Sequence, residues 1–293
     1  MKIIVTGSKG MLATQVIMDL QRGYTELGTI PSVLKNATLT CCDYDVLDIT
    51  DGSACLDFIE KEQPDILINC AAYTNVDACE TNQSDAFKVN ALGPRNLAIA
   101  CEKVGAKLVH ISTDYVFSGE GSVPFCEYDR PDPQSVYGKT KLSGEEFVKQ
   151  YCKKSFIIRT AWLYGYDGKN FVKTIVSAGA ARGALTVVND QRGNPTNAAD
   201  LSHHILKVAA GQEYGTYHCT GKGECSWYDF ACEIIRLSKV KATLTPCTTA
   251  QYNSPTKRPA YSSLDNMMLR VSVGDEMRPW QEALAAYFEN QQK

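Results

Sequence analysis

Three residues with side chains suited to proton transfer are Thr113, Tyr137 and Lys141. Tyr137 and Lys141 form a YxxxK unit, and this i, i+4 spacing places both side chains on one face of a helix. A free phenol has a pKa near 10, but a neighbouring ammonium favours the phenolate and brings the pKa closer to the working range. Most Tyr and Lys pairs at this spacing are surface pairs, so YxxxK alone is a weak signal. Its weight comes from the residues around it.

Thr113 follows the apolar run KLVHI (107–111), which is typical of a buried strand. Ser112, Thr113 and Asp114 therefore stand at the carboxyl end of that strand, 24 residues before Tyr137. There the hydroxyl of Thr113 can hydrogen-bond the substrate oxygen that Tyr137 protonates, and Asp114 can shape the floor of the pocket. The pattern predicts acid–base chemistry on a substrate oxygen.

A glycine pattern, GxxGxxA, lies between the strand KIIVT (2–6) and the next helix. Gly7 permits a tight turn, Gly10 lets the main chain approach a pyrophosphate, and Ala13 sits where helix packs on strand. Such a turn could be only a connection, but at the first strand–helix junction it favours dinucleotide binding. Asp43 ends the second strand and is the candidate for the ribose hydroxyls, although it lies further on than usual. The choice between NADH and NADPH stays open.

The elements that must position these residues alternate along the first half of the chain. The predicted strands are 2–6, 39–43, 65–69, 107–111 and 156–160, and the predicted helices are 10–20, 53–62, 84–104 and 137–150. Near-continuous apolar strands separated by amphipathic helices indicate a parallel sheet covered on both faces. Glycines and a proline make residues 21–38 an expected surface loop. The fold class is therefore α/β, with a Rossmann-type doubly wound parallel sheet.

After residue 160 the alternation loosens, as expected for a smaller α+β substrate-binding lobe. Strands are expected at 185–189 and 216–219, and helices at 198–210, 227–238 and 280–291. We assign residues 1–162 to a dinucleotide-binding domain, to which 185–212 and part of 256–275 return. Residues 163–184 and 213–293 form mainly the substrate-binding lobe.

Composition limits the class of protein. A net charge of -3 in 293 residues, without a basic run, argues against nucleic-acid binding. No apolar stretch is long enough to cross a bilayer, and no signal peptide precedes the first strand, so we expect a soluble, cytoplasmic protein without a membrane partner. The twelve cysteines lack metal-type spacing, and most are expected to be reduced core residues.

Further stretches carry a resemblance to the extended short-chain dehydrogenases/reductases, and within them to the dTDP-4-dehydrorhamnose reductases. The similarity runs in order along nearly the whole chain. The stretches are NCAAYTNVDACE (69–80), KVNALGPRNLA (88–98), STDYVFSG (112–119), PQSVYGKTKLSGE (133–145), RTAWLYG (159–165), NFVKT (170–174), DQRGNPT (190–196) and RPAYSSLD (258–265).

The resemblance implies a reduction in which a bound NADPH or NADH gives hydride to the C4 ketone of a nucleotide sugar. It makes Thr113, Tyr137 and Lys141 the catalytic set. The implied cofactor contacts are Gly7, Gly10, Met11, Leu12, Asp43, Asp48, Ile49, Ala72, Tyr73, Thr74, Tyr137 and Lys141. The implied substrate contacts are Val76, Thr113, Asp114, Trp162 and, at the nucleotide end, Arg258.

The chain departs from the family pattern at two places. Ala13 replaces the third glycine, and Tyr73 stands where many relatives have His; the 21–38 loop also leaves the ribose contact less secure than the catalytic set. Some members bind Mg²⁺ at a dimer interface, and a homodimer is compatible with the resemblance. Because no acidic cluster of fixed spacing is present, we assign no metal.

Three other activities remain to be weighed. Nucleotide-sugar dehydratases carry an Asp-Glu pair after the Thr, whereas this chain has Asp114 and Tyr115. An epimerase could use the same Tyr and Lys with tightly held NAD. A non-catalytic partner resembling the methionine adenosyltransferase β subunit could keep the same scaffold. The intact catalytic set and the stretches 159–165 and 190–196 favour the reductase.

Two groups of residues are better explained by packing than by chemistry. Trp227, Tyr228 and Phe230 open an amphipathic helix and are expected in the core of the smaller lobe. His203 and His204 lie on a predicted helix without a third ligand nearby, and we expect both to be structural.

Overall fold

A computed structural model describes residues 1–252 and 256–291 of the chain. Its centre is a six-stranded sheet in which every neighbouring pair of strands is parallel. In spatial order the strands are β12 (Gly215–His218), β7 (Ser155–Thr160), β6 (Lys107–Thr113), β5 (Ile66–Asn69), β1 (Lys2–Thr6) and β4 (Thr38–Cys42). The predicted α/β class and doubly wound sheet are thereby confirmed.

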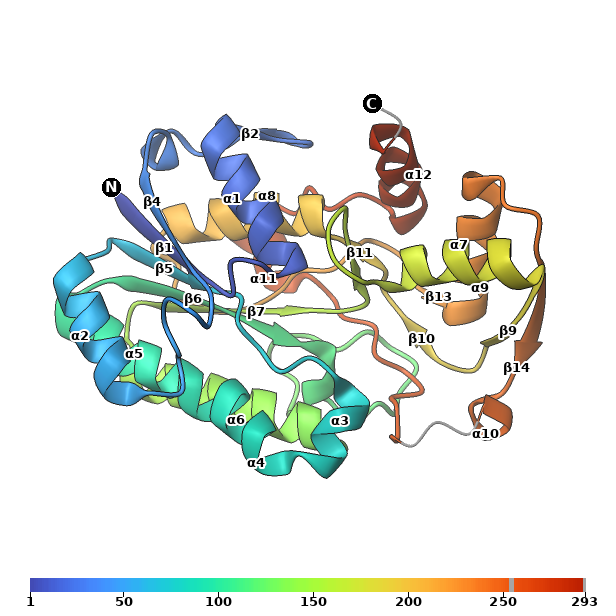
Figure 1. Ribbon diagram of the computed structural model, residues 1–293, viewed down its shortest axis with the longest axis horizontal. Coiled ribbons are helices and arrows are strands. Elements are labelled where there is room, and N and C mark those ends of the chain that lie inside the picture. The colour runs from blue at the N-terminus through green and yellow to red at the C-terminus, as the bar shows by residue number, and fades with distance from the viewer. Residues whose placement is uncertain (253–255, 292–293) are drawn as a thin grey trace.

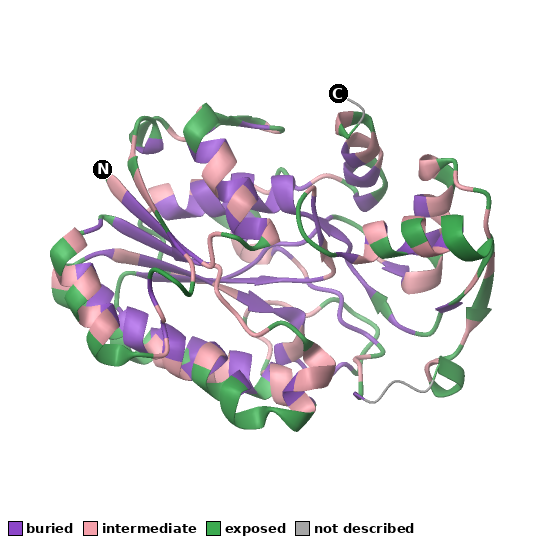
Figure 2. Ribbon diagram, viewed as in Figure 1, coloured by how far each residue is buried: buried purple, intermediate pink, exposed green. Residues whose placement is uncertain are grey.

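Helices cover both faces of this sheet (Figure 1). One face carries α1 (Met11–Arg22), α8 (Ala198–Ala210) and α11 (Met267–Val271); the other carries α2 (Gly52–Glu62), α5 (Gly93–Val104) and α6 (Val136–Tyr151). Successive side chains of a strand point to opposite faces, so Ile3 and Val5 join the core under α1 while Ile4 joins the core over α2. Figure 2 shows the strands buried and the outer helix faces exposed.

The chain between α2 and β6 is more broken than the predicted helix 84–104. It contains α3 (Val76–Thr81), α4 (Gln83–Phe87) and a π-helical segment, η2 (Lys88–Leu92), before α5 begins. Segment 21–38, expected to be a surface loop, contains short regular elements. It carries the short hairpin β2 (Tyr24–Thr25) and β3 (Gly28–Thr29) and a 3₁₀ turn, η1 (Ser32–Leu34), whose Leu34 is buried.

A smaller set of elements lies beside the carboxyl ends of the strands (Figure 1). Its apolar core joins α7 (Phe171–Arg182), α9 (Trp227–Ser238) and α12 (Trp280–Asn290). Short strand pairs complete it: β9 (Ala184–Val188) with β14 (Thr243–Cys247), β10 (Arg192–Gly193) with β13 (Cys225–Ser226), and β8 (Leu163–Tyr164) with β11 (Thr196–Asn197). The remaining helical elements are η3 (Asp114–Val116) and α10 (Thr249–Tyr252).

The central sheet and the smaller lobe share the chain differently from the expected division at two points. β9 pairs with β14 away from the central sheet, so the return to that sheet begins at α8 and not at residue 185. β12, inside the range assigned mainly to the smaller lobe, forms an edge of the central sheet.

The residues given a packing role behave largely as expected. His203 hydrogen-bonds Thr25 and Glu276, and His204 receives the main-chain N–H of Glu276. All twelve cysteines are free and most are buried, although Cys41 on the edge strand β4 is exposed. No helix in residues 1–252 and 256–291 is long and apolar enough to span a membrane.

Candidate active site

A cleft of about 870 Å³ opens at the carboxyl ends of the central strands. Its size lies within the range of small-molecule and cofactor sites. It is lined by all but one of the residues predicted from the sequence, namely Gly7, Gly10, Met11, Leu12, Asp43, Asp48, Ile49, Ala72, Thr74, Val76, Thr113, Asp114, Tyr137, Lys141, Trp162 and Arg258. Residues more than 200 positions apart in the chain thus meet in one place.

The exception is Tyr73, which is absent from the described residues that line the cleft. Its main-chain N–H and carbonyl are bonded to the side chain of Asn90, at 2.8 and 3.1 Å. Its hydroxyl accepts a hydrogen bond from Asn82 at the junction of α3 and α4. Asn90 thus fixes the main chain of Tyr73, and the bond from Asn82 holds its hydroxyl beside the helices. The cofactor contact of Tyr73 stays a prediction.

The glycine loop between β1 and α1 has the features of an anion-binding turn. Gly7 has φ +65°, and a Cβ there would lie 2.8 Å from the main chain of Ala71, so a side chain cannot be accommodated. The N–H of Gly10 closes the turn on the carbonyl of Gly7 at 2.9 Å. Gly10 caps α1 without a side-chain hydrogen bond, which leaves first-turn N–H groups for a ligand. This loop fits a dinucleotide pyrophosphate.

The predicted ribose residue, Asp43, lies beside this loop despite its unusual distance in sequence. Its carboxylate accepts the main-chain N–H of Lys9 at 2.9 Å and that of Tyr44 at 2.8 Å. Asp48 accepts two hydrogen bonds from Thr50 and so organises its own turn. The carboxylate of Asp43 retains lone pairs for ribose hydroxyls.

The catalytic set comes from two elements that meet at the sheet edge. Thr113 is the last residue of β6, whereas Tyr137 and Lys141 lie in the first turns of α6, which Ser135 caps. The hydroxyl of Thr113 donates to Asp114 Oδ1 at 2.9 Å, and Tyr137 hydrogen-bonds Thr113. β6 extends two residues further than predicted, and this places Thr113 in the ladder.

The electrostatics of the pair differ from the expectation. Burial raises the pKa of Tyr137 above its ordinary value, while the hydrogen bond with Thr113 opposes the shift. Burial also lowers the pKa of Lys141 to about 8. The Lys141 ammonium donates to the carbonyl of Ile111 at 2.6 Å. Desolvation therefore outweighs any lowering of the phenol pKa by Lys141, and Tyr137 is held as the protonated phenol that a proton donor requires.

Asp114 is buried next to Thr113, and desolvation raises the pKa of its carboxyl to about 6. The hydroxyl of Ser262 interacts with this carboxyl, but Oδ2 makes no hydrogen bond of regular geometry in the described chain. A buried polar atom of this kind is costly unless a ligand satisfies it. The carboxyl group is therefore suited to a sugar hydroxyl.

Two tryptophans form one wall of the cleft. Trp162 stacks on Trp227, with ring centroids 3.5 Å apart and planes 6° apart. Trp162 has φ 46°, an uncommon conformation for a bulky residue and one that functional sites often retain. Gly193 gives room to its indole, since a Cβ there would lie 2.6 Å from the ring. The sequence predicted Trp162 but assigned Trp227 to the core alone.

A buried ion pair supports the site from beneath. Arg159 on β7 and Glu145 on α6 form two hydrogen bonds, Nε–Oε1 at 2.9 Å and Nη2–Oε2 at 2.7 Å. Ser112 donates to the same carboxylate at 2.6 Å. All three side chains are buried. The network fixes the end of β6 against α6, the two elements that carry the catalytic set.

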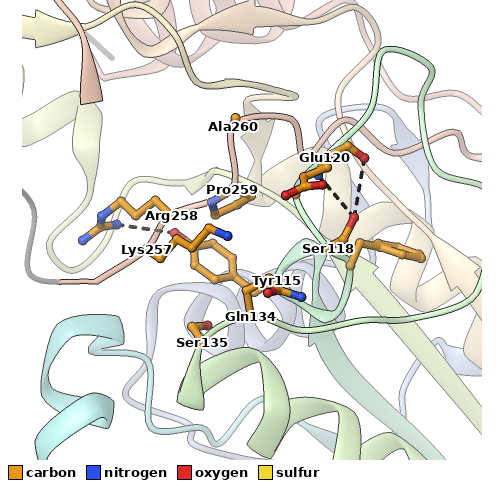
Figure 3. Close-up of a pocket in the computed structure, with 11 residues that line it drawn as sticks. Tyr115, Ser118, Glu120, Gln134, Ser135, Lys257, Arg258, Pro259 and Ala260 are labelled. Carbon is orange, nitrogen blue, oxygen red and sulfur yellow. Dashed lines mark hydrogen bonds between the residues drawn. The ribbon is translucent and has the colours of Figure 1, made fainter. Parts of the chain in front are cut away.

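At the other end of the cleft Arg258 connects the two parts of the protein. Its Nη2 contacts both carboxylate oxygens of Asp77 at 3.1 and 3.2 Å, and its Nη1 lies 3.4 Å from the hydroxyl of Tyr115. A second cavity of about 100 Å³ adjoins this point. Figure 3 shows Tyr115 between the segment from Lys257 to Ala260 on one side and Gln134 on the other. Arg258 lines both cavities.

In the part of the chain that the structure describes, no group of three or more His, Cys, Asp or Glu side chains is arranged to hold a metal ion. The residues of the cleft suit a dinucleotide and a polar organic substrate.

Comparisons with known proteins agree with this arrangement. Residues 1–293 match the family model described as RmlD substrate binding domain. The spore coat polysaccharide biosynthesis protein SpsK of Bacillus subtilis is 37% identical over 288 residues, covering 98% of this chain and 97% of that protein. A crystal structure of a dTDP-4-dehydrorhamnose reductase from Clostridium acetobutylicum is 47% identical, with TM-score 0.94 and all of both chains covered. One from Bacillus anthracis in complex with NADP is 40% identical, with TM-score 0.91 and coverage of 99% and 100%.

Proposed function

The chain belongs to the RmlD substrate binding domain family, and from that premise we propose that it is a dTDP-4-dehydrorhamnose reductase. It uses NADPH or NADH to reduce the C4 ketone of dTDP-4-dehydro-L-rhamnose and yields dTDP-L-rhamnose, a precursor of cell-surface polysaccharide. The observation that carries the proposal is the meeting of Thr113, Tyr137 and Lys141 with the glycine loop in one cleft.

Each step of the reduction can be given to a residue of the cleft. The nicotinamide, when bound, supplies the hydride. Tyr137 donates its phenolic proton to the oxygen that becomes the new hydroxyl, and protonated Lys141 stabilises the negative charge left on the phenol. The hydroxyl of Thr113 turns from Asp114 to the same substrate oxygen, while Asp114 accepts from a neighbouring sugar hydroxyl. Trp162 forms the apolar wall against the sugar ring.

The two parts of the chain divide this work. Residues 1–162 with α8 hold the dinucleotide through the glycine loop and Asp43, and the smaller lobe supplies Trp162's partner, Trp227, and Arg258. Arg258 suits the diphosphate of the nucleotide because a guanidinium binds such anions well. Assembly as a homodimer and binding of Mg²⁺ stay predictions from the resemblance, to be measured by light scattering and metal analysis.

The experiment that tests this function follows oxidation of NADPH and NADH in the presence of enzymatically made dTDP-4-dehydro-L-rhamnose. In Tyr137→Phe we expect turnover to fall by about 10²–10⁴-fold, the range of a lost general acid, with a far smaller loss of cofactor affinity. Tyr128→Phe is the matched control, since Tyr128 is exposed on the surface. Folded wild-type protein that binds cofactor but does not consume it would contradict the reductase.

The two remaining activities predict different results in the same assay. An epimerase retains its cofactor through turnover, so it would show no net oxidation of added NADPH. A regulatory subunit resembling the methionine adenosyltransferase β subunit would bind that enzyme in a pull-down and leave the sugar unchanged.

A further inference from the structure

The adenosine end of the cleft holds an unusual combination of charges. Asp43, which faces the ribose in the proposed function, is followed by Tyr44 and Asp45, and the glycine loop places Lys9 against them. The cations that line the described cleft are Lys9, Lys141, Lys169 and Arg258. Lys141 donates to the carbonyl of Ile111 under the end of β6 and Arg258 contacts Asp77, so both are bonded away from Asp43 and Lys9.

Lys9 is tied to the ribose residue through its main chain and not through its ammonium. Its N–H donates to Asp43 Oδ2 at 2.9 Å, which fixes the start of its side chain beside the ribose site. The ammonium reaches away to Asp45, with Nζ–O distances of 3.0 and 3.1 Å. The Lys9 and Asp45 side chains are 70% and 65% exposed. Water screens such a pair, so it can be exchanged for another at little cost.

The two nicotinamide cofactors differ at this corner by one phosphate on the 2′ oxygen of the adenosine ribose. A free 2′ hydroxyl donates to Asp43, whereas a 2′-phosphate is repelled by the carboxylates of Asp43 and Asp45. An ammonium that leaves Asp45 gains a charge-assisted hydrogen bond to the phosphate. Asp45 and the phosphate therefore compete for one cation, Lys9.

We propose that Lys9 is the residue that admits the 2′-phosphate of NADPH and that Asp45 weakens this contact by competing for the Lys9 ammonium. These residues set the cofactor preference. Asp43 accepts the 2′ hydroxyl of NADH, Lys9 binds the 2′-phosphate of NADPH, and Asp45 weakens the second contact and so keeps the two affinities close. This inference rests on the proposed function for the existence of a dinucleotide site, but it concerns binding alone.

The test is isothermal titration of the whole protein with NADP⁺ and NAD⁺, and with 2′-phospho-ADP-ribose and ADP-ribose, which lack the nicotinamide. In Lys9→Gln we expect NADP⁺ to bind about tenfold more weakly, since one charge-assisted contact is lost, and NAD⁺ to change less than twofold. In Asp45→Asn we expect NADP⁺ to bind several-fold more tightly, with NAD⁺ again little changed. The phosphorylated and unphosphorylated ADP-riboses should repeat both patterns.

Three control variants test whether the effects are specific to Lys9 and Asp45. Lys61→Gln and Asp57→Asn on α2 change the net charge equally and should leave both affinities unchanged. Lys169→Gln removes the other cation near the glycine loop: a Cβ built on the preceding residue, Gly168, would lie 3.6 Å from the side chain of Met11. A selective loss of NADP⁺ binding in Lys169→Gln but not in Lys9→Gln would overturn the assignment, as would equal losses for NADP⁺ and NAD⁺ in Lys9→Gln.

An unchanged NADP⁺ affinity in Asp45→Asn would overturn the competition between carboxylate and phosphate. These outcomes stay separate from the proposed function. A protein that follows the expected binding pattern but reduces no sugar would refute the reductase and keep the role of Lys9. A protein that reduces the sugar but loses affinity for NADP⁺ and NAD⁺ equally in Lys9→Gln would keep the reductase and refute the role of Lys9.

Discussion

Replacing Lys141 by methionine should abolish activity and at the same time stabilise the folded protein. Lys141 is only 2% exposed, and its ammonium donates to the main-chain carbonyl of Ile111. Burial lowers its pKa from 10.5 to about 8, a shift that the nearby carboxylate of Glu145 only partly opposes. The native state therefore holds a charge that it would be more stable without.

The size of the effect follows from the shift. Each pKa unit corresponds to about 1.4 kcal/mol, so the buried charge costs about 3 kcal/mol at pH 7. Methionine removes this cost but leaves the carbonyl of Ile111 without its donor, and the lost hydrogen bond destabilises the variant by about 1 to 2 kcal/mol. We expect Lys141→Met to be about 1 to 2 kcal/mol more stable than wild type, a rise of a few degrees in Tm.

The pH dependence gives the prediction its sign. Because folding lowers the pKa of Lys141, the unfolded chain binds more protons between pH 8 and 10.5. The contribution of Lys141 to the free energy of unfolding of wild type is therefore least favourable below pH 8 and becomes more favourable as pH rises from 8 to 10.5. The advantage of Lys141→Met over wild type should be full below pH 8, vanish between about pH 9 and 10, and turn into a deficit by about pH 10.5, where the charge cost has gone and only the lost donor to Ile111 remains.

The assay is urea unfolding of both proteins at several pH values, with Lys139→Met as the control. Lys139 is an exposed lysine on the same helix, so its replacement should give no such gap. Wild-type turnover should also fall as pH rises through about 8, because the ammonium that stabilises the phenolate is lost. A Lys141→Met protein less stable than wild type at pH 7, or a gap constant up to pH 10.5, would refute the reasoning.

Three further substitutions test the walls and supports of the cleft. Trp227→Leu removes the stack on Trp162 and should raise KM for the nucleotide sugar up to about tenfold, the worth of an aromatic pair, with cofactor affinity unchanged by titration. Gly193→Ala puts a methyl group 2.6 Å from the Trp162 indole; we expect lower kcat/KM for the sugar and a lower Tm. Glu145→Gln leaves Arg159 without its buried counter-ion and should cost about 3 to 5 kcal/mol of unfolding free energy, measured in urea.

Much of the site could be predicted because a parallel sheet brings the carboxyl ends of its strands together. Residues that follow β1, β4, β5 and β6 must meet at one edge, whatever their separation in sequence. Asp43 shows how robust this is. Segment 21–38 forms a hairpin and a 3₁₀ turn, returns the chain to β4, and so leaves Asp43 beside the glycine loop.

The parts that sequence reasoning missed depend on contacts between distant segments. Trp227 opens an amphipathic helix, and its helical neighbour Phe230 is buried as expected. At the first position of the helix, however, its ring reaches Trp162, and no periodicity within α9 reports that contact. α7 was not predicted because glycine, alanine and polar residues weaken its apolar stripe. Lys9 was read only as part of the loop.

The pKa of Tyr137 is shifted in the direction opposite to the expected one, because of burial. An i, i+4 spacing fixes a separation between two side chains but says nothing about the dielectric around them. Burial raises the pKa of Tyr137 and lowers that of Lys141, so both shifts oppose formation of the charged pair. That opposition makes Tyr137 a better-defined proton donor before the reaction. The charged form is needed only as the substrate oxygen takes the proton.

Three features that weaken the fold lie together at the carboxyl edge of the sheet. They are the buried charge of Lys141, the Asp114 oxygen without a hydrogen bond of regular geometry and the left-handed backbone of Trp162. The network of Glu145, Arg159 and Ser112 lies directly beneath and joins the same two elements, β6 and α6. Such strain persists only where the surrounding structure over-determines it. Weakening this network should thus disturb the position of Lys141 before it unfolds the sheet.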